Sequence, residues 1–420
     1  MSRLGRRVGL LCALAVISSV LVLLPAARAQ VGPYEVQVGH FFGFGGTRCN
    51  EQTGERCKVQ AESMRFLPSS IDVPKGELVH FVTGFHTATL LPANSDVSKW
   101  VEDNATGVDE PWNFVVPDPD ADVAGGPVAS HKFNPQALFP SPSGCGDAQA
   151  NPCVSDGTSI VNSGIPIAQF PGSFWVKVDA NVGDTVRVVC LVHPKMRLRI
   201  DVVPAAQASD PAALQQAVQH TLVSDLDLAK ATHNRMATIQ SKHVTADGTT
   251  VWDAWAGFDT EFVSLDEMYP TRLRIKKGDR VRWHLESLVN EHHTATFPFS
   301  TARQVSNDEG FMFDCDPDGD SGAGPDVPAT FDPATGPGCP GGPSQLEVEF
   351  SDRFGLLRGN GRFAGGSDYE NSGIRTGSGN VPQALASYTL QFTRVSPDTG
   401  FRYLCMIHGP GMAGRVFVSG

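Results

Sequence analysis

Short runs of alternating apolar and polar residues, separated by turns rich in Pro and Gly, recur along most of the 420-residue chain. Ile71 and Val73 alternate with polar residues before one such turn, and Val79 and Phe81 alternate after it. Successive side chains of a strand point to opposite faces, so this pattern predicts half-buried β-strands. The 43 glycines and 30 prolines, with few long helical patterns, favour an all-β architecture.

Residues 205–245 depart from this pattern and predict a helix between two β-rich halves. Asp210 can accept a hydrogen bond at the helix N-terminus, and Pro211 suits the first helical position. Apolar residues then recur at a helical spacing, at Leu214, Val218, Leu222 and Leu226.

The second half of the chain repeats the first. Pro68, Val73, Gly76 and Phe81 correspond to Pro270, Ile275, Gly278 and Trp283, each 202 positions later. Asn-Ser-Gly-Ile occurs at 162–165 and again at 371–374. Because strands and loops recur together, we expect a duplicated domain. The predicted division is a first domain at 30–204, a helical linker at 205–245 and a second domain at 246–420, with long loops at 92–165 and 298–375.

The first 29 residues are typical of a secretory signal peptide. Arg3, Arg6 and Arg7 precede an apolar run, and Ala-Arg-Ala at 27–29 offers a cleavage site. We expect export to the periplasm or the cell exterior, with an uncleaved membrane anchor as the alternative. No other stretch is apolar enough to span a bilayer.

Cleavage would leave a strongly acidic chain. It removes four arginines and no acidic residue, so 29 basic residues face 45 acidic ones, a net charge of −16. Such a charge disfavours binding to nucleic acid or anionic lipid and favours a basic partner. An equally good interpretation is that the acidic residues keep an exported protein soluble. The sequence does not indicate an oligomeric state.

The cysteines divide into two groups. Of nine cysteines, Cys12 lies in the signal segment, and Cys190 and Cys405 lie in the motifs described next. The remaining six suit an oxidising compartment. Their positions suggest three local disulfides: Cys49–Cys57, Cys145–Cys153 and Cys315–Cys339.

Two short motifs combine a thiol, an imidazole and a thioether. They are Cys190-x2-His193-x2-Met196 and Cys405-x2-His408-x3-Met412, and each half also carries His-Thr-Ala-Thr, beginning at His86 and His293. Alternation with Val186 and Val188 predicts that the Cys190 thiol points into the core. Soft sulfur together with imidazole favours copper, and two histidines, a cysteine and a weak axial methionine suit a blue-copper site.

This arrangement resembles the cupredoxin family, most closely its plastocyanin and amicyanin branch. The resemblance implies two tandem Greek-key cupredoxin β-barrels with long loop insertions. It also implies one type 1 copper per domain and single-electron transfer with a redox partner, possibly basic and cytochrome c-like. The implied metal ligands are His86, Cys190, His193 and Met196 in the first domain and His293, Cys405, His408 and Met412 in the second.

The resemblance also implies how electrons would reach the copper. His193 and His408 would lie nearest the surface, with a docking patch formed by Leu191, Val192, Met406, Ile407 and Pro410. One departure concerns the residue after the first ligand histidine, which is usually Asn in the family and is Thr87 or Thr294 here.

Other functions are less consistent with the sequence. Copper delivery is the main alternative to electron transfer. Multicopper oxidases use His-x-His pairs, which this chain lacks. A nitrite reductase would need further histidines, and His131, His284 and His292 show no suitable spacing. We therefore predict a protein that is not an enzyme.

Calcium is a further candidate ligand. The aspartates at 118, 120 and 122 and at 316, 318 and 320 alternate as in calcium loops. The second cluster lacks the glutamate that such loops place at their end, so an acidic, solvated turn is the competing interpretation.

Overall fold

The computed structural model describes the chain in segments. They are residues 33–45, 48–50, 55–56, 59–101, 112, 115–117, 131–165, 172–289, 291–308, 312–315, 327–328, 330–332, 336–339, 346–349, 352–374 and 386–420, some of the short strands among them as backbone alone. The predicted signal segment and both aspartate clusters lie outside these residues. Among the described helices, none is both long and apolar enough to cross a membrane.

One sheet runs through both halves of the chain. Its strands, in spatial order, are β10 (Cys153–Ser155), β12 (Ser173–Val178), β6 (Leu78–Thr83), β1 (Tyr34–Phe44), β4 (Val59–Leu67), β17 (Val263–Tyr269), β16 (Thr250–Asp259), β19 (Arg280–His284), β29 (Ser387–Phe392) and β27 (Arg362–Phe363). The strand β15 (Ser241–Val244) pairs with β16 beside this path. The halves join where β4 pairs antiparallel with β17, with Glu62 opposite Ser264.

Each half adds a second sheet with the same strand order. In the first half it is β11 (Val161–Asn162), β7 (Thr89–Leu90), β13 (Thr185–Val189), β14 (Arg197–Val203) and β5 (Ser70–Pro74). In the second it is β28 (Glu370–Ser372), β20 (Thr296–Phe297), β30 (Phe401–Cys405), β31 (Gly409–Ser419) and β18 (Arg272–Lys276), extended by β26 (Leu357–Arg358). The predicted internal repeat is therefore also a repeat of topology.

The cores explain the alternating sequence pattern. Strand β6 alternates half-buried and buried residues, with Val79 and Phe81 inward, and the first core is mainly aliphatic. The second core is richer in aromatic residues around Trp283, which is fully buried. The predicted fold class is confirmed: the described residues form cupredoxin-like β-sandwiches.

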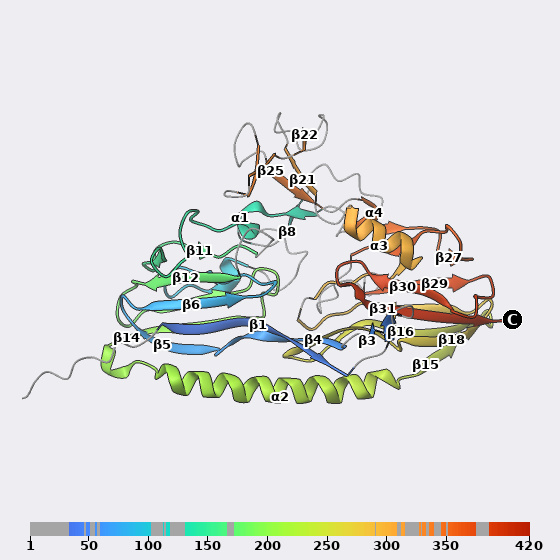
Figure 1. Ribbon diagram of the computed structural model, residues 1–420, viewed down its shortest axis with the longest axis horizontal. Helices are drawn as coiled ribbons and strands as arrows, with labels where there is room; N and C mark the ends of the chain where they lie inside the picture. The colour runs from blue at the N-terminus through green and yellow to red at the C-terminus, as the bar shows by residue number, and fades with distance from the viewer. Residues whose placement is uncertain are drawn as a thin grey trace, which may run out of the picture. The chain divides into compact units, whose positions relative to one another are not determined.

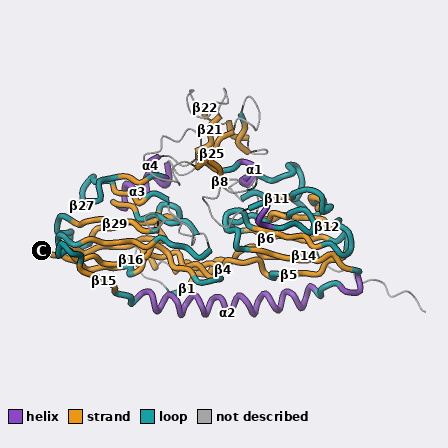
Figure 2. The backbone as a smooth tube through the Cα atoms, turned by 180° about the vertical axis from the view of Figure 1, so that it is seen from behind, coloured by secondary structure: helices purple, strands orange, loops and turns teal. Residues whose placement is uncertain are grey.

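The helix between the halves is longer than a simple linker. Helix α2 spans Pro211–Ala237, and its N-terminus is capped by Asp210, whose carboxylate accepts from Ala212 N–H, as predicted. It packs along β1, β4 and β17 (Figures 1 and 2). Because it spans the β4–β17 junction, it stabilises both halves together. Residues Pro33–Gly420 form one compact unit, and the proposed boundaries at 204 and 246 stay a prediction.

The long loops carry short elements. In the first half they include η1 (Val97–Lys99), β8 (Val115–Pro117), β9 (His131–Phe133) and α1 (Pro135–Leu138), with β2 (Arg48–Asn50), β3 (Glu55–Arg56) and η3 (Ala205–Gln207) elsewhere. In the second they include α3 (Phe299–Asp308), β21 (Met312–Cys315), β22 (Val327–Pro328), β23 (Thr330–Asp332), β24 (Gly336–Gly338), β25 (Leu346–Glu349) and α4 (Asp352–Gly355). The two loop regions touch, because β25 contacts β9 and α1.

The disulfide predictions are tested in part. Cys145 and Cys153 are bonded, as predicted. Cys339 is also disulfide-bonded, whereas the side chains of Cys49, Cys57 and Cys315 lie outside the described part of the chain. Cys190 and Cys405 are free and buried.

Asp225 fastens α2 to the sheet and allows a first test. Its buried carboxylate accepts hydrogen bonds from Ser63 Oγ at 2.6 Å and from Arg65 Nη2 at 2.9 Å. Asp225→Asn should lower the free energy of unfolding by about 2–3 kcal/mol, because it weakens charge-assisted bonds at a buried site. The measurement is chemical denaturation. Asp227→Asn, on the exposed side of the same helix, should change stability little; equal effects would contradict this role.

Candidate functional site

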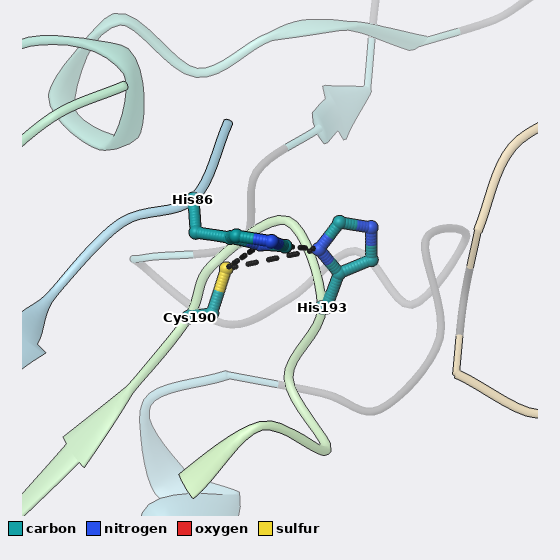
Figure 3. Close-up of side chains that lie close together, drawn as sticks. All are labelled: His86, Cys190 and His193. Carbon is teal, nitrogen blue, oxygen red and sulfur yellow. Dashed lines mark hydrogen bonds between the residues drawn. The ribbon is translucent and has the colours of Figure 1, made fainter. Parts of the chain in front are cut away.

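Three side chains from separate segments converge in the first half (Figure 3). His86 follows β6, Cys190 follows β13, and His193 lies in the turn before β14. His86 Nδ1 lies 3.0 Å from His193 Nδ1, and Cys190 Sγ lies 3.7 and 3.9 Å from these two nitrogens. All three residues are buried. The close-up shows both rings and the sulfur directed at one another.

The spacing of these three atoms fits a metal ion. The point equidistant from them lies about 2.1 Å from each, within the ~2.0–2.3 Å typical of nitrogen and sulfur bound to an ion such as Zn²⁺. Two imidazoles and one thiol form a trigonal donor set, which suits copper when a soft axial ligand is added. Met196 is 1 % exposed and belongs to the same core as Cys190.

The second half repeats the constellation. The ligand atoms of His293, Cys405 and His408 lie within 4.8 Å of one another. Cys405 Sγ is 3.5 Å from His408 Nδ1 and accepts a hydrogen bond from Thr294 N–H at 3.3 Å. Neither ring nitrogen of His293 has a hydrogen-bond partner among the described residues. A buried imidazole without a partner is costly, so a metal ion would satisfy an otherwise unmet donor atom.

Threonine ties the ligand segments together, at the position where the family usually has asparagine. Leu191 N–H, directly after Cys190, donates to Thr87 Oγ1 at 2.8 Å. Met406 N–H, directly after Cys405, donates to Thr294 Oγ1 at the same distance. The threonine after each first histidine therefore fixes that histidine's segment to the cysteine of the same triad.

The two repeated loop motifs continue this hydrogen-bond chain. Thr87 and Thr89 hydroxyls lie 3.1 Å apart, and Thr89 donates to Asn162 Oδ1 at 2.8 Å. Asn162 in turn donates to the Ala137 and Phe139 carbonyls. The second half has the same chain through Thr294, Thr296 and Asn371. This explains physically why His-Thr-Ala-Thr and Asn-Ser-Gly-Ile recur as a pair.

Buried carboxylates stand behind the imidazoles, and sequence reasoning missed them. Glu62 Oε1 lies 2.5 Å from His86 Nε2. Glu291 lies 2.9 Å from His193 Nε2 and 3.2 Å from His408 Nε2, and Asp266 is 4.0 Å from the latter. No sequence motif marks these acids, although Glu291 comes just before His292 and His293.

These neighbours shift the pKa values of the candidate ligands. Burial alone would raise the pKa of the Cys190 thiol, but the His193 and His86 imidazoles lower it to about 5. Burial lowers the pKa of His193, but Glu291 and Cys190 outweigh it and raise that pKa to about 9. The Cys405 pKa is likewise held well below its ordinary value by His408 and His293, against burial. The imidazoles therefore favour the thiolate form of both sulfurs, which is the form that binds metals.

The predicted exposure of the loop histidines is wrong for the first half. The side chain of His193 is only 3 % exposed, while that of His408 is 18 % exposed. Leu191, Val192 and Met406, predicted to form a docking patch, are buried. Leu191 packs with Val101, Ala137 and Ile160, and Met406 packs with Ala302, Val305 and Phe354, so the long loops of each half cover its own ligand loop. The first ligand loop also contacts the other half, where Lys195 donates to the Leu288 carbonyl.

Of the histidines considered for a nitrite-reductase-like site, His284 is engaged elsewhere. His284 pairs with Asp253 at 3.0 Å and Glu286 at 3.4 Å. His292 lies next to the second triad in sequence, and the side chain of His131 is outside the described residues. Within the part of the chain that is described, only the two Cys/His/His groups bring three potential metal-binding residues together.

Comparison with known proteins gives distant matches only. No protein family and no curated protein matches the chain. Among solved structures, it is similar to a multicopper oxidase (11 % identity, 92 % of this chain and 88 % of that chain covered, TM-score 0.17). It is also similar to a blue copper oxidase from Nitrosomonas europaea (12 %, 85 % and 85 %, TM-score 0.16) and to multicopper oxidase mgLAC (11 %, 85 % and 85 %, TM-score 0.15).

These matches require one correction. The sequence-based prediction that the chain is not an enzyme is contradicted, because each of these three similar structures is a copper oxidase. A copper enzyme therefore stays among the candidate functions. TM-scores this low carry no activity over to this chain. The cupredoxin-like fold rests on the paired sheets of the chain itself, and none of these three structures is a plastocyanin or an amicyanin.

Gly39 provides a test of how tightly the first triad is packed. A Cβ atom at Gly39 (φ +70°) would lie 2.3 Å from His86 Nε2, whereas one at Gly45 (φ +59°) would meet nothing within 4 Å. Gly39→Ala should lower the free energy of unfolding by about 2–4 kcal/mol and weaken copper binding, through backbone strain and overpacking. Gly45→Ala should cost only the strain, about 1–2 kcal/mol. Denaturation curves and copper titrations of both variants check this; indistinguishable curves would refute the close packing.

Thr87 provides a second test. Thr87→Val removes the acceptor for Leu191 N–H while keeping the side chain's shape, and should destabilise the buried loop by about 1–3 kcal/mol. Thr87→Ser retains the hydroxyl and should preserve copper affinity. Isothermal titration with copper measures the difference. If valine and serine variants bind copper equally well, the hydroxyl does not position the ligands.

Proposed function

We propose that the chain is a copper protein that carries single electrons, with one type 1 copper ion in each triad. The observation behind the proposal is the twofold convergence of a buried thiol with two imidazoles in a duplicated cupredoxin-like fold. Bound copper would supply a one-electron couple, Cu(I)/Cu(II), which a His₂Cys set with a weak thioether suits.

The ligands of each copper ion would all come from residues of this chain. Cys190 and Cys405 would supply the thiolates, and the neighbouring imidazoles lower the pKa of both thiols. His86 and His193, and His293 and His408, would each supply an imidazole nitrogen. Met196 and Met412, both buried, would be the axial thioethers. The Cys-x2-His-x2-Met spacing, which resembles that of amicyanin, and the Cys-x2-His-x3-Met spacing, which falls between those of amicyanin and plastocyanin, support this assignment.

We also infer the setting in which this protein works. Export after loss of residues 1–29 would bring it to the periplasm or the cell exterior, which suits its Cys145–Cys153 disulfide. Its acidic surface would attract a basic redox partner, such as a cytochrome c-like protein. His408 is the more exposed of the two loop histidines, so we infer that a partner docks nearer the second triad.

The decisive test is the colour of the copper-loaded protein. We expect an intense thiolate-to-copper band and a type 1 EPR signal. Cys190→Ser and Cys405→Ser should each remove about half of the band if the sites are equivalent. The double variant should be colourless, which provides the matched control. A colourless wild-type protein under oxidising conditions would refute the proposal.

The same sample separates an electron carrier from an oxidase. Rapid reversible reduction by a small redox protein, without loss of copper, supports electron carriage. Sustained oxygen consumption with an electron donor would instead identify a copper enzyme. Transfer of the copper itself to a chelating partner would identify a delivery protein.

A further inference from the structure

A single buried carboxylate touches one imidazole of each triad. Glu291 Oε2 lies 2.9 Å from His193 Nε2, and Glu291 Oε1 lies 3.2 Å from His408 Nε2. The glutamate side chain is only 10 % exposed. Since His193 and His408 belong to different halves of the chain, Glu291 is a direct link between the two triads.

The segment that carries Glu291 is held firmly. Glu291 N–H donates to Ser287 Oγ at 2.6 Å, and the Ser287 hydroxyl donates to the buried carboxylate of Asp259. Val289 packs into the aliphatic core of the first half, although it belongs to the second half in sequence. The carboxylate is therefore fixed in position relative to both halves.

We propose that Glu291 is a positioning residue shared by the two triads, and that it couples them. This inference rests on the proposed copper sites. The 2.9 Å contact of Glu291 with His193 Nε2 is a close charge contact that is not aligned as a hydrogen bond. Its negative charge favours hydrogen on Nε2, which leaves the Nδ1 lone pair free to face the cysteine. One oxygen of Glu291 does this for His193 and the other for His408. A change of charge at one triad changes the strength of the interaction between its histidine ring and Glu291. It therefore also changes the interaction of Glu291 with the histidine ring of the other triad.

A second carboxylate provides the matched control. Glu62 is buried like Glu291 and lies 2.5 Å from His86 Nε2. Glu62 lies beside a histidine of the first triad, and it reaches the second triad only indirectly, through its charge on Asp266, which is 4.0 Å from His408 Nε2. Removing its charge should perturb one site, whereas removing that of Glu291 should perturb two.

Glutamine is the informative substitution at both positions. It keeps the size of glutamate but offers one oxygen and one amide NH₂. In Glu291→Gln, one ring can keep an acceptor, while the other faces a donor and loses its preferred tautomer. In Glu62→Gln, the single oxygen can still face His86.

The first experiment uses the full chain without metal. Ring nitrogen NMR of ¹⁵N-histidine protein reports the protonation and hydrogen bonding of each nitrogen of each imidazole. We expect Glu291→Gln to shift the ring signals of both His193 and His408, and Glu62→Gln to shift His86 while leaving His408 unchanged. Signals that change at only one triad in Glu291→Gln would overturn the sharing of this carboxylate.

The second experiment uses the copper-loaded protein. In backgrounds that keep one site, Cys190→Ser or Cys405→Ser, Glu291→Gln should raise the reduction potential of whichever site remains, because a nearby negative charge stabilises Cu(II). Glu62→Gln should raise the potential of the first site only. A purely structural role for Glu291 would lower stability but leave both potentials unchanged, and that result would overturn the proposal.

The two proposals fail in different ways. If wild-type protein binds no copper, the proposed function fails, and the metal-free NMR measurement still tests whether Glu291 serves both rings. If copper binds with its blue band but Glu291→Gln alters one site alone, the function stands and the coupling is refuted.

Discussion

One hydrogen bond, made twice, underlies both triads. The amide after each cysteine donates to the hydroxyl after each first histidine, through Thr87 in one half and Thr294 in the other. These groups lie more than a hundred residues apart in sequence, so no local structure could place a thiol beside that imidazole. Strands β6 and β13 bring the segments near, and the threonine fixes their relative position. Asn162 and Asn371 then anchor each threonine pair to the surrounding loops.

The pairing of the two sandwiches through β4 and β17 changes the exposure and the contacts of the ligand loops. Pairing of β4 with β17, covered by α2, turns the first ligand loop toward the second half. His193 loses its contact with solvent and gains Glu291, while His408 keeps partial exposure. The sites are therefore unequal despite their common ancestry in sequence. In the first triad each imidazole has a carboxylate beside it. In the second both carboxylates lie beside His408, and both ring nitrogens of His293 lack hydrogen-bond partners among the described residues.

The sequence predicts well whatever depends on periodicity and repetition. Alternation located the strands around Val73 and Val79, and the cap at Asp210 located α2. The repeated motifs predicted which cysteine and which two histidines form each triad. What it could not predict depends on how the halves meet. Glu62, Asp266 and Glu291 have no motif, because their role comes from burial at a junction between strands distant in sequence. The burial of Val192 has the same origin, since it shares a core with Val289 of the other half. That of Leu191 comes from the long loop of its own half, where it packs with Val101, Ala137 and Ile160.

The central claim is that each triad binds one copper ion. Anomalous X-ray scattering at the copper edge, from crystals of the copper-loaded full chain, locates each ion directly. The predicted result is two peaks, one among His86, Cys190 and His193 and one among His293, Cys405 and His408. Strong peaks elsewhere, such as beside Glu291 and Asp266, with neither triad occupied, would contradict it.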